Sequence, residues 1–239
     1  PIGVIPHGLD VKKYQDNVPY SIAGIKDTTY VFYDIFQWQE RKNPAGLLKA
    51  YWYEFQNQED VALVLKTHRA SYEESEKNAI REAIKNLKRG MVMDKYPPIY
   101  YLSDMLSESE LLGLHARGNC YVSLDRGEGF GLGPFEAGAS GNPIIVTGVG
   151  GVKEYANSDN AMLVDCLLTP VSNMPWSPWY RGDQLWAEPD LLHAAQKMRW
   201  AYDHQPVAKA LAERLRTCIA NNFTWDHIGK RIIKEIQEI

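Results

Sequence analysis

The chain has 239 residues, a formal net charge of −4, and a composition that is 45% hydrophobic and 23% charged. This balance is typical of a globular domain with a substantial core. It argues against a dedicated nucleic-acid binder, because the acidity is mild and no dense run of lysine and arginine occurs.

No apolar run approaches the roughly 20 residues that a membrane span needs, and no signal peptide is visible, so we expect a cytoplasmic protein. Three widely spaced cysteines without a Cys-x-x-Cys pair predict neither a zinc site nor a disulfide framework. The first residue is Pro1 rather than Met, which suggests a piece of a longer protein.

Short apolar runs rich in β-branched and aromatic residues alternate with helical stretches, as in a parallel sheet with helices on both faces. The expected strands cover residues 30–36, 62–67, 99–102, 120–124, 143–147 and 162–164. The expected helices cover residues 44–56, 72–87, 107–116, 134–139, 152–155, 189–203, 206–221 and 225–239. We therefore predict an α/β fold: one Rossmann-like domain over residues 1–239, in which 189–239 form C-terminal helices.

Residues 167–188 depart from this alternation, because they form an unusually long connection that contains prolines, three tryptophans, Tyr180 and Arg181. Two interpretations remain open. The segment is either a platform for an acceptor sugar or a partner domain, or an ordered loop whose aromatic side chains cover the core.

The most informative segment runs from Glu128 to Glu136 and is rich in glycine. A strand precedes it, and we expect a helix to open at Pro134, because proline suits the first helical position. Its glycines permit positive φ and a close approach of the backbone to a ligand. The amide groups and the dipole at a helix start attract phosphate, while a carboxylate on either side accepts hydrogen bonds from hydroxyls. The pattern predicts a nucleotide-sugar site.

Residues 128–136 resemble the Glu-x7-Glu motif of retaining glycosyltransferases with the GT-B fold, in particular family 4 (group 1). Four further segments are similar to that family, and they occur in the family's order: residues 4–10, 40–44, 147–154 and 223–230. The resemblance covers nearly the whole chain. It implies the second, donor-binding domain of such an enzyme, with the N-terminal acceptor domain absent from this chain.

The resemblance implies two catalytic residues. Glu128 would accept hydrogen bonds from the donor sugar, and Lys42 would neutralise the diphosphate and the charge that grows on the leaving nucleotide. Glu136 would hold the ribose hydroxyls, although a glutamate at about the third helical position also caps a helix. Asp125 and Arg126 are expected to form a local pair that shapes the loop.

Further donor contacts are expected on the same rim of the sheet. The backbone of Gly129, Phe130, Gly131, Leu132 and Gly133 would seat the diphosphate, with the Phe130 ring packed beneath the loop. The family usually has an arginine where this chain has Gln37. Three interpretations stay open: Arg41 substitutes, the backbone amides carry more of the binding, or the activity is weaker. Two interpretations stay open for Lys66: it contacts the base or ribose, or it is simply the polar end of a strand. It is equally open whether Met105 and Leu106 form an apolar shelf beside the base.

The leading prediction is a retaining glycosyltransferase of the hexosyltransferase type, as used in polysaccharide biosynthesis, with a UDP-, GDP- or ADP-linked sugar as donor. No metal or other cofactor is expected, since no Asp-x-Asp motif occurs and Lys42 can replace a cation. The expected partners include the missing acceptor domain but no nucleic acid, and membrane association would arise only through the missing part. Alone, this domain would be inactive or weak.

Three other functions were weighed against this prediction. A nicotinamide oxidoreductase fails because no register gives Gly-x-Gly-x-x-Gly and the glycine loop does not follow the first strand. Two alternatives stay open: a non-catalytic nucleotide-binding module that needs a partner domain, and a nucleotide-sugar epimerase built on the GT-B scaffold.

Overall fold

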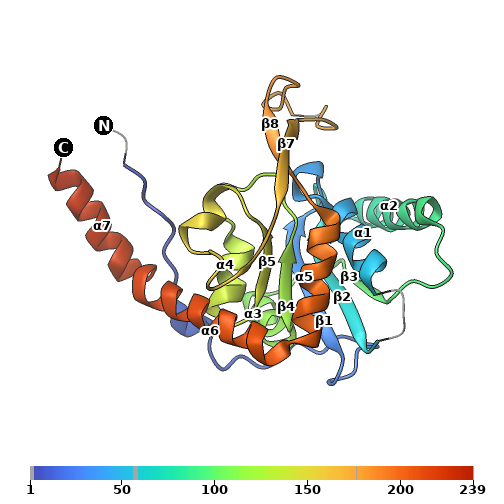
Figure 1. The fold of residues 1–239 in the computed structure, drawn as a ribbon, viewed down its shortest axis with the longest axis horizontal. Coiled ribbons are helices and arrows are strands. Elements are labelled where there is room, and N and C mark those ends of the chain that lie inside the picture. Colours follow the sequence, from blue (N-terminus) through green and yellow to red (C-terminus); the bar gives the residue numbers. More distant parts are fainter. Residues whose placement is uncertain (1–2, 56–58, 176, 239) are drawn as a thin grey trace.

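The computed structural model describes residues 3–55, 59–175 and 177–238. Its centre is a parallel six-stranded sheet in the order β3-β2-β1-β4-β5-β6 (Figure 1). The strands are β1 (Tyr30–Gln37), β2 (Val61–His68), β3 (Ile99–Leu102), β4 (Cys120–Ser123), β5 (Ile144–Thr147) and β6 (Met162–Val164). The α/β Rossmann-like prediction is confirmed, and every predicted strand is present with ends within one residue of those expected.

Helices cover both faces of the sheet (Figure 1). They are α1 (Pro44–Glu54), α2 (Glu74–Met91), α3 (Glu108–Arg117), α4 (Leu132–Ala139), α5 (Leu191–Asp203), α6 (Gln205–Asn222) and α7 (Trp225–Gln237). Short 3₁₀ turns are η1 (Val11–Tyr14), η2 (Glu40–Lys42) and η3 (Gly150–Glu154), and the last of these replaces the helix predicted over 152–155.

The core is divided in two by the sheet, as the period-two direction of strand side chains requires. On β1, Phe32 packs with α1, α2 and α5, whereas Val31 and Tyr33 pack on the other face with α3, α4 and α6. Both faces of the sheet are therefore covered by packed, mostly apolar side chains.

Residues 167–188 do not form a loop over the core, so that interpretation is wrong. They belong to an antiparallel ribbon of β7 (Cys166–Pro170) and β8 (Leu185–Pro189) that projects from the sheet (Figure 1). Trp186 is buried in a small cluster of its own with Val171 and Met174, while Trp179 is 79% exposed. Trp176, the third tryptophan of the segment, lies outside the described residues.

The chain ends in two consecutive helices, α6 and α7, and α7 extends away from the body of the sheet (Figure 1). Within the described ranges, no helix is both long and apolar enough to cross a membrane.

Candidate functional site

The candidate site lies where the strand order reverses, between β1 and β4. In an open parallel sheet, ligands bind beyond the carboxyl ends of the strands at this switch point, because the loops diverge there and leave a crevice. The loop after β1 leads into η2, the loop after β4 carries the glycine-rich segment, and the loop after β5 leads into η3.

A lysine shared by two carboxylates forms the centre of the site. The Nζ atom of Lys42 lies 2.8 Å from Oδ2 of Asp125 and also donates to Oε2 of Glu128. Arg41 adds a second cation, with its Nη1 atom 3.2 Å from the same oxygen of Glu128. The structure thus brings Lys42, Arg41 and Glu128 together as one cluster and adds Asp125, which the sequence did not assign to it.

Local backbone structure holds the two cations in place. Asn43 follows η2 in the left-handed conformation, which asparagine tolerates, and its side chain caps α1 by accepting from the Gly46 amide at 3.1 Å. The carbonyl of Arg41 also accepts from the amide of Arg126 at 2.8 Å. The start of α1 and the loop after β4 are therefore fixed to each other.

Burial and the shared lysine together set the pKa values of the two carboxyl groups far apart. Burial would raise the pKa of Glu128, but the hydrogen bond and charge of Lys42 outweigh burial and lower it to about 2. Burial raises the pKa of Asp125 to about 6, because Lys42 offsets the desolvation only in part and the Glu128 charge adds to it. Glu128 is therefore a firmly ionised acceptor at neutral pH.

A third carboxyl group, Asp34 on β1, lies buried behind the cluster, and neither of its oxygens has a hydrogen-bond partner among the described residues. Burial, and then the charge of Asp125, raise its pKa well above the ordinary value. Burial therefore favours the neutral form of Asp34, a residue that sequence reasoning missed, although a lone aspartate in an apolar strand was a signal.

The predicted local pair of Asp125 and Arg126 is wrong. The two consecutive side chains have different partners. Asp125 turns to Lys42, whereas Arg126 donates two hydrogen bonds to Glu188 on β8, at 2.6 and 3.0 Å, and one to the carbonyl of Glu40 at 2.7 Å. Arg126 thus ties the ribbon to the site.

The glycine loop is shaped mainly by close packing. Gly131 has φ +83° and caps α4, and its carbonyl accepts from the Tyr155 hydroxyl at 2.6 Å. A Cβ on Gly133 would lie 2.2 Å from the Tyr121 hydroxyl, so that glycine serves packing, whereas a Cβ on Gly129 would meet open space. The Phe130 ring packs beneath the loop against Phe135, Tyr155 and Phe223, as expected.

Helix α4 begins at Leu132, two residues earlier than predicted, because Gly131 supplies the left-handed turn that opens it. Glu136 therefore stands fifth in the helix, not third, and the first turn contains no acidic residue. Its carboxylate instead faces α3 and η1. The Oε2 atom lies 3.8 Å from Nε2 of His115, and its charge contributes, after burial, to raising the pKa of Tyr14.

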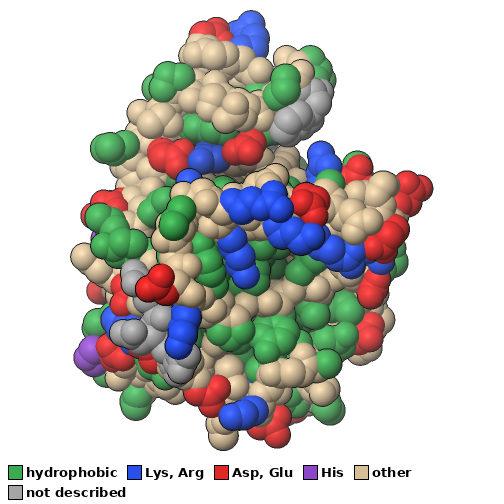
Figure 2. Space-filling model, turned by 90° about the vertical axis from the view of Figure 1, so that its right-hand side faces the viewer, with side chains coloured by type: hydrophobic (Ala, Val, Ile, Leu, Met, Phe, Trp, Pro, Cys, Tyr) green, Lys and Arg blue, Asp and Glu red, His purple; other side chains and the backbone are tan. Residues whose placement is uncertain are grey.

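The remaining predicted residues lie along the same rim but outside the Lys42 cluster. Gln37 donates to the carbonyl of Arg69 at 3.0 Å and lines a separate cavity of about 640 Å³. Lys66 is buried with its ammonium 4.9 Å from the centre of the Tyr72 ring, and burial lowers its pKa. Figure 2 shows Lys and Arg side chains gathered around a hollow on the face that carries α1 and α2.

The two members of the predicted apolar shelf behave differently. Met105 is 71% exposed, whereas Leu106 packs against the apolar cluster that contains Phe130. Met105 is thus the one available to a ligand at the surface.

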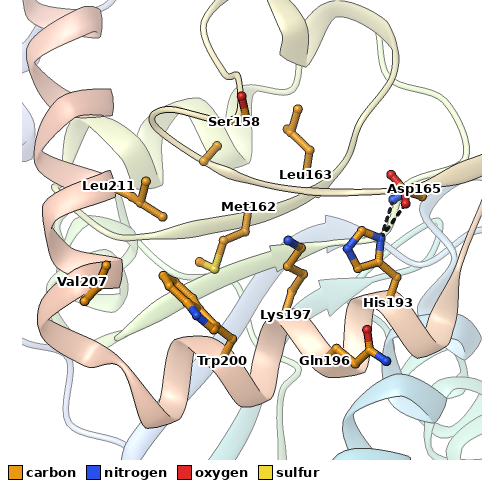
Figure 3. Close-up of a pocket in the computed structure, with 11 residues that line it drawn as sticks. Ser158, Met162, Leu163, Asp165, His193, Gln196, Lys197, Trp200, Val207 and Leu211 are labelled. Atoms are coloured by element: carbon orange, nitrogen blue, oxygen red, sulfur yellow. Dashed lines mark hydrogen bonds and ion pairs between the residues drawn. The ribbon is translucent and has the colours of Figure 1, made fainter.

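Two further cavities lie near the carboxyl ends of the strands and along α5. One of about 600 Å³ is shared between the Lys42 cluster and the ribbon, with Arg41 and Glu128 in its wall. Another of about 670 Å³ lies between β6, α5 and α6, with Trp200, Lys197 and the His193–Asp165 pair in its lining (Figure 3). The second shares no lining residue with the Lys42 cluster, so it does not belong to the candidate site.

No protein family and no curated protein matches this sequence. Solved structures do match. Anabaena Alr3699/HepE in complex with UDP and glucose has a TM-score of 0.69 and 15% identity, over 99% of this chain and 57% of that one. Sucrose-phosphate synthase from Thermosynechococcus elongatus gives 0.68 and 18%, over 99% and 52%.

The C-terminal domain of a group 1 family glycosyl transferase (LpcC) from Francisella tularensis gives a TM-score of 0.60 and 16% identity, over 93% of this chain and 100% of that one. This chain therefore spans just over half the length of the first two proteins and matches the third over its whole length. The fold is that of the C-terminal domain of GT-B glycosyltransferases. Identities this low establish the fold alone.

Proposed function

We propose that this chain is the donor-binding half of a retaining glycosyltransferase that uses a nucleotide-sugar. The observation that carries the proposal is the meeting of Lys42, Glu128 and the start of α4 at the switch point of a GT-B-type sheet. UDP is our first candidate for the nucleotide, because structures of the similar HepE protein are complexes with UDP and UDP-glucose.

Lys42 and Arg41 are the cations of the proposed diphosphate site. Burial alone lowers the pKa of Lys42, but the charges of Asp125 and Glu128 outweigh it and raise the pKa, so a full positive charge faces the diphosphate. Lys42 and the first amides of α4 would stabilise the charge that develops on the leaving phosphate, and no metal ion is then required. Arg41 would supply the second cation where the family's arginine is replaced by Gln37.

Glu128 and Glu136 would hold the two sugars of the donor. Ionised Glu128 accepts hydrogen bonds from the transferred sugar, and Glu136, whose side chain is 35% exposed on the α3 side of α4, accepts from the ribose hydroxyls. The leaving phosphate oxygen would take the proton of the acceptor hydroxyl as the new glycosidic bond forms on the same face of the sugar. We further propose that a second domain supplies additional contacts to the acceptor.

Calorimetric titration with UDP, GDP and ADP in the presence of EDTA tests this proposal. We expect one nucleotide to bind, and Glu136→Gln to weaken that binding at least tenfold, about 1.4 kcal/mol, through loss of an ionised acceptor. The matched control is Glu82→Gln, an exposed glutamate on α2, which should leave the affinity unchanged. If no nucleotide binds, donor binding by this chain is refuted. If Glu136→Gln and Glu82→Gln bind the nucleotide equally well, the role of Glu136 is refuted.

A further inference from the structure

We infer that the 600 Å³ cavity between the glycine loop and the β7–β8 ribbon is a subsite for a pyranose ring of the acceptor. This inference rests on the proposed function, since it names the substrate that meets the donor sugar. The cavity has the size of a small-molecule site and shares its wall with the Lys42 cluster. Its lining includes Arg41, Glu128, Gly129, Tyr180, Gln184 and Trp186.

The ribbon is a fixed wall of this cavity. The amide of Ala187 donates to the carbonyl of Arg126 at 2.8 Å, and the Arg126 guanidinium holds Glu188 through two hydrogen bonds. The same guanidinium lies 4.9 Å from the centre of the Trp186 ring. Bidentate pairing and ring stacking restrain orientation as well as distance, so the aromatic side of the ribbon is set at a defined place beside Glu128.

The lining has the chemistry that a sugar ring requires. Tyr180, packed against the buried Trp186, offers aromatic surface for the C–H face of a pyranose, while Arg41, Gln184 and Glu128 offer donors and acceptors for its hydroxyls. The floor is backbone, because a Cβ added to Gly127 or Gly129 would meet no atom within 4 Å. Few convergent polar groups around an apolar wall are typical of a small-molecule site.

The order of groups along the rim favours an acceptor sugar over the donor's own sugar. Glu136 faces His115 on α3, the start of α4 comes next, and Glu128 faces Arg41 on the opposite side. A nucleotide-sugar with its ribose at Glu136 and its diphosphate at α4 places its transferred sugar at Glu128. The cavity continues from Glu128 toward the ribbon, where the next sugar would lie.

Saturation-transfer NMR on the UDP-saturated chain tests the inference, with the methyl glycosides of glucose, galactose and mannose, maltose and lactose as probes. We expect a saturation-transfer signal on at least one of these sugars. That signal should fall at least fivefold in both Tyr180→Ala and Gln184→Ala. The control Trp179→Ala removes an exposed ribbon aromatic that does not line the cavity and should change nothing. Affinities for UDP and UDP-glucose should stay within twofold in all three variants.

Several outcomes would overturn the subsite. These are UDP binding without transfer to any probe, equal transfer in the Tyr180 and Trp179 variants, and a Tyr180→Ala variant weakened for UDP-glucose but not for UDP. The last result would show that the cavity holds the donor's sugar. If the chain binds no nucleotide but still gives a saturation-transfer signal on a sugar that depends on Tyr180, the cavity is supported as a sugar site and the proposed function is refuted.

Discussion

At the level of single residues, the site depends on one lysine that serves two carboxylates. Glu128 is the more exposed of the two and gains most from Lys42, whereas Asp125, whose side chain is 8% exposed, pays for its desolvation with a raised pKa. A single cation cannot neutralise both groups, and the deeper one takes up the proton more readily. The arrangement keeps the outer carboxylate charged for a ligand.

This difference predicts a pH dependence of stability. The pKa of Asp125 rises from 3.8 to about 6 on folding, so the folded state binds more protons between those values and the free energy of unfolding falls as pH rises through them. The linkage amounts to roughly 3 kcal/mol. In urea denaturation, wild type should therefore lose about 2 kcal/mol of this stability relative to Asp125→Asn between pH 4.5 and 7.

Glu128 does not confuse this measurement. Its pKa is lowered on folding, so its contribution is present above pH 4.5 and is lost only as the pH falls toward 2. If the stability of wild type relative to Asp125→Asn stays constant or increases as the pH rises from 4.5 to 7, the raised pKa of Asp125 is contradicted.

The motif residues could be predicted from sequence because each lies within a short, patterned segment. Their partners could not. Asp125 meets Lys42 across 83 positions, and Arg126 meets Glu188 across 62, and no spacing in the sequence records such contacts. The predicted pair of Asp125 and Arg126 relied on adjacency, which does not bring two side chains together when each has a partner elsewhere in the chain.

At the level of elements, the loop after β4 and the loop after β5 are packed backbone against backbone. The amide of Gly151 lies 3.3 Å from the carbonyl of Glu128, and a Cβ on Gly151 would lie 1.9 Å from the carbonyl oxygen of Gly129. No side chain fits between them. The shape of the glycine loop is therefore set by η3, a segment twenty residues further along the chain.

Gly151→Ala should accordingly displace the glycine loop. We expect a loss of about 1–3 kcal/mol of stability, in the range of overpacked sites, together with weaker nucleotide binding. The matched control is Gly229→Ala on α7, where a Cβ meets open space and should stabilise the helix by up to about 1 kcal/mol. Denaturant midpoints and UDP titration of both variants check this, and a Gly151→Ala variant as stable and as active in binding as wild type would disprove the packing argument.

Two element-level errors have physical causes. Proline at the first helical position is a preference, and Gly131 with its positive φ outweighed it by starting α4 two residues earlier. The β7 and β8 strands were missed because each ends in proline, a residue that interrupts sheet hydrogen bonding.

At the level of the whole molecule, alternation of strands and helices was enough to predict a doubly wound sheet and the rim at which the candidate site lies. What alternation does not give is the side of the rim that each group faces. Glu128 and Glu136 are eight residues apart, yet one faces Arg41 on η2 and the other His115 on α3. That separation suits a long, two-ended ligand better than a compact one.

The most direct measurement is backbone amide NMR of the chain titrated with UDP-glucose. The account predicts that the largest shift changes fall on residues 129–132 and on Lys42, with smaller changes around Glu136. Largest changes in the cavity between β6, α5 and α6, at Trp200 or Lys197, or no changes at all, would contradict a nucleotide-sugar site at the start of α4.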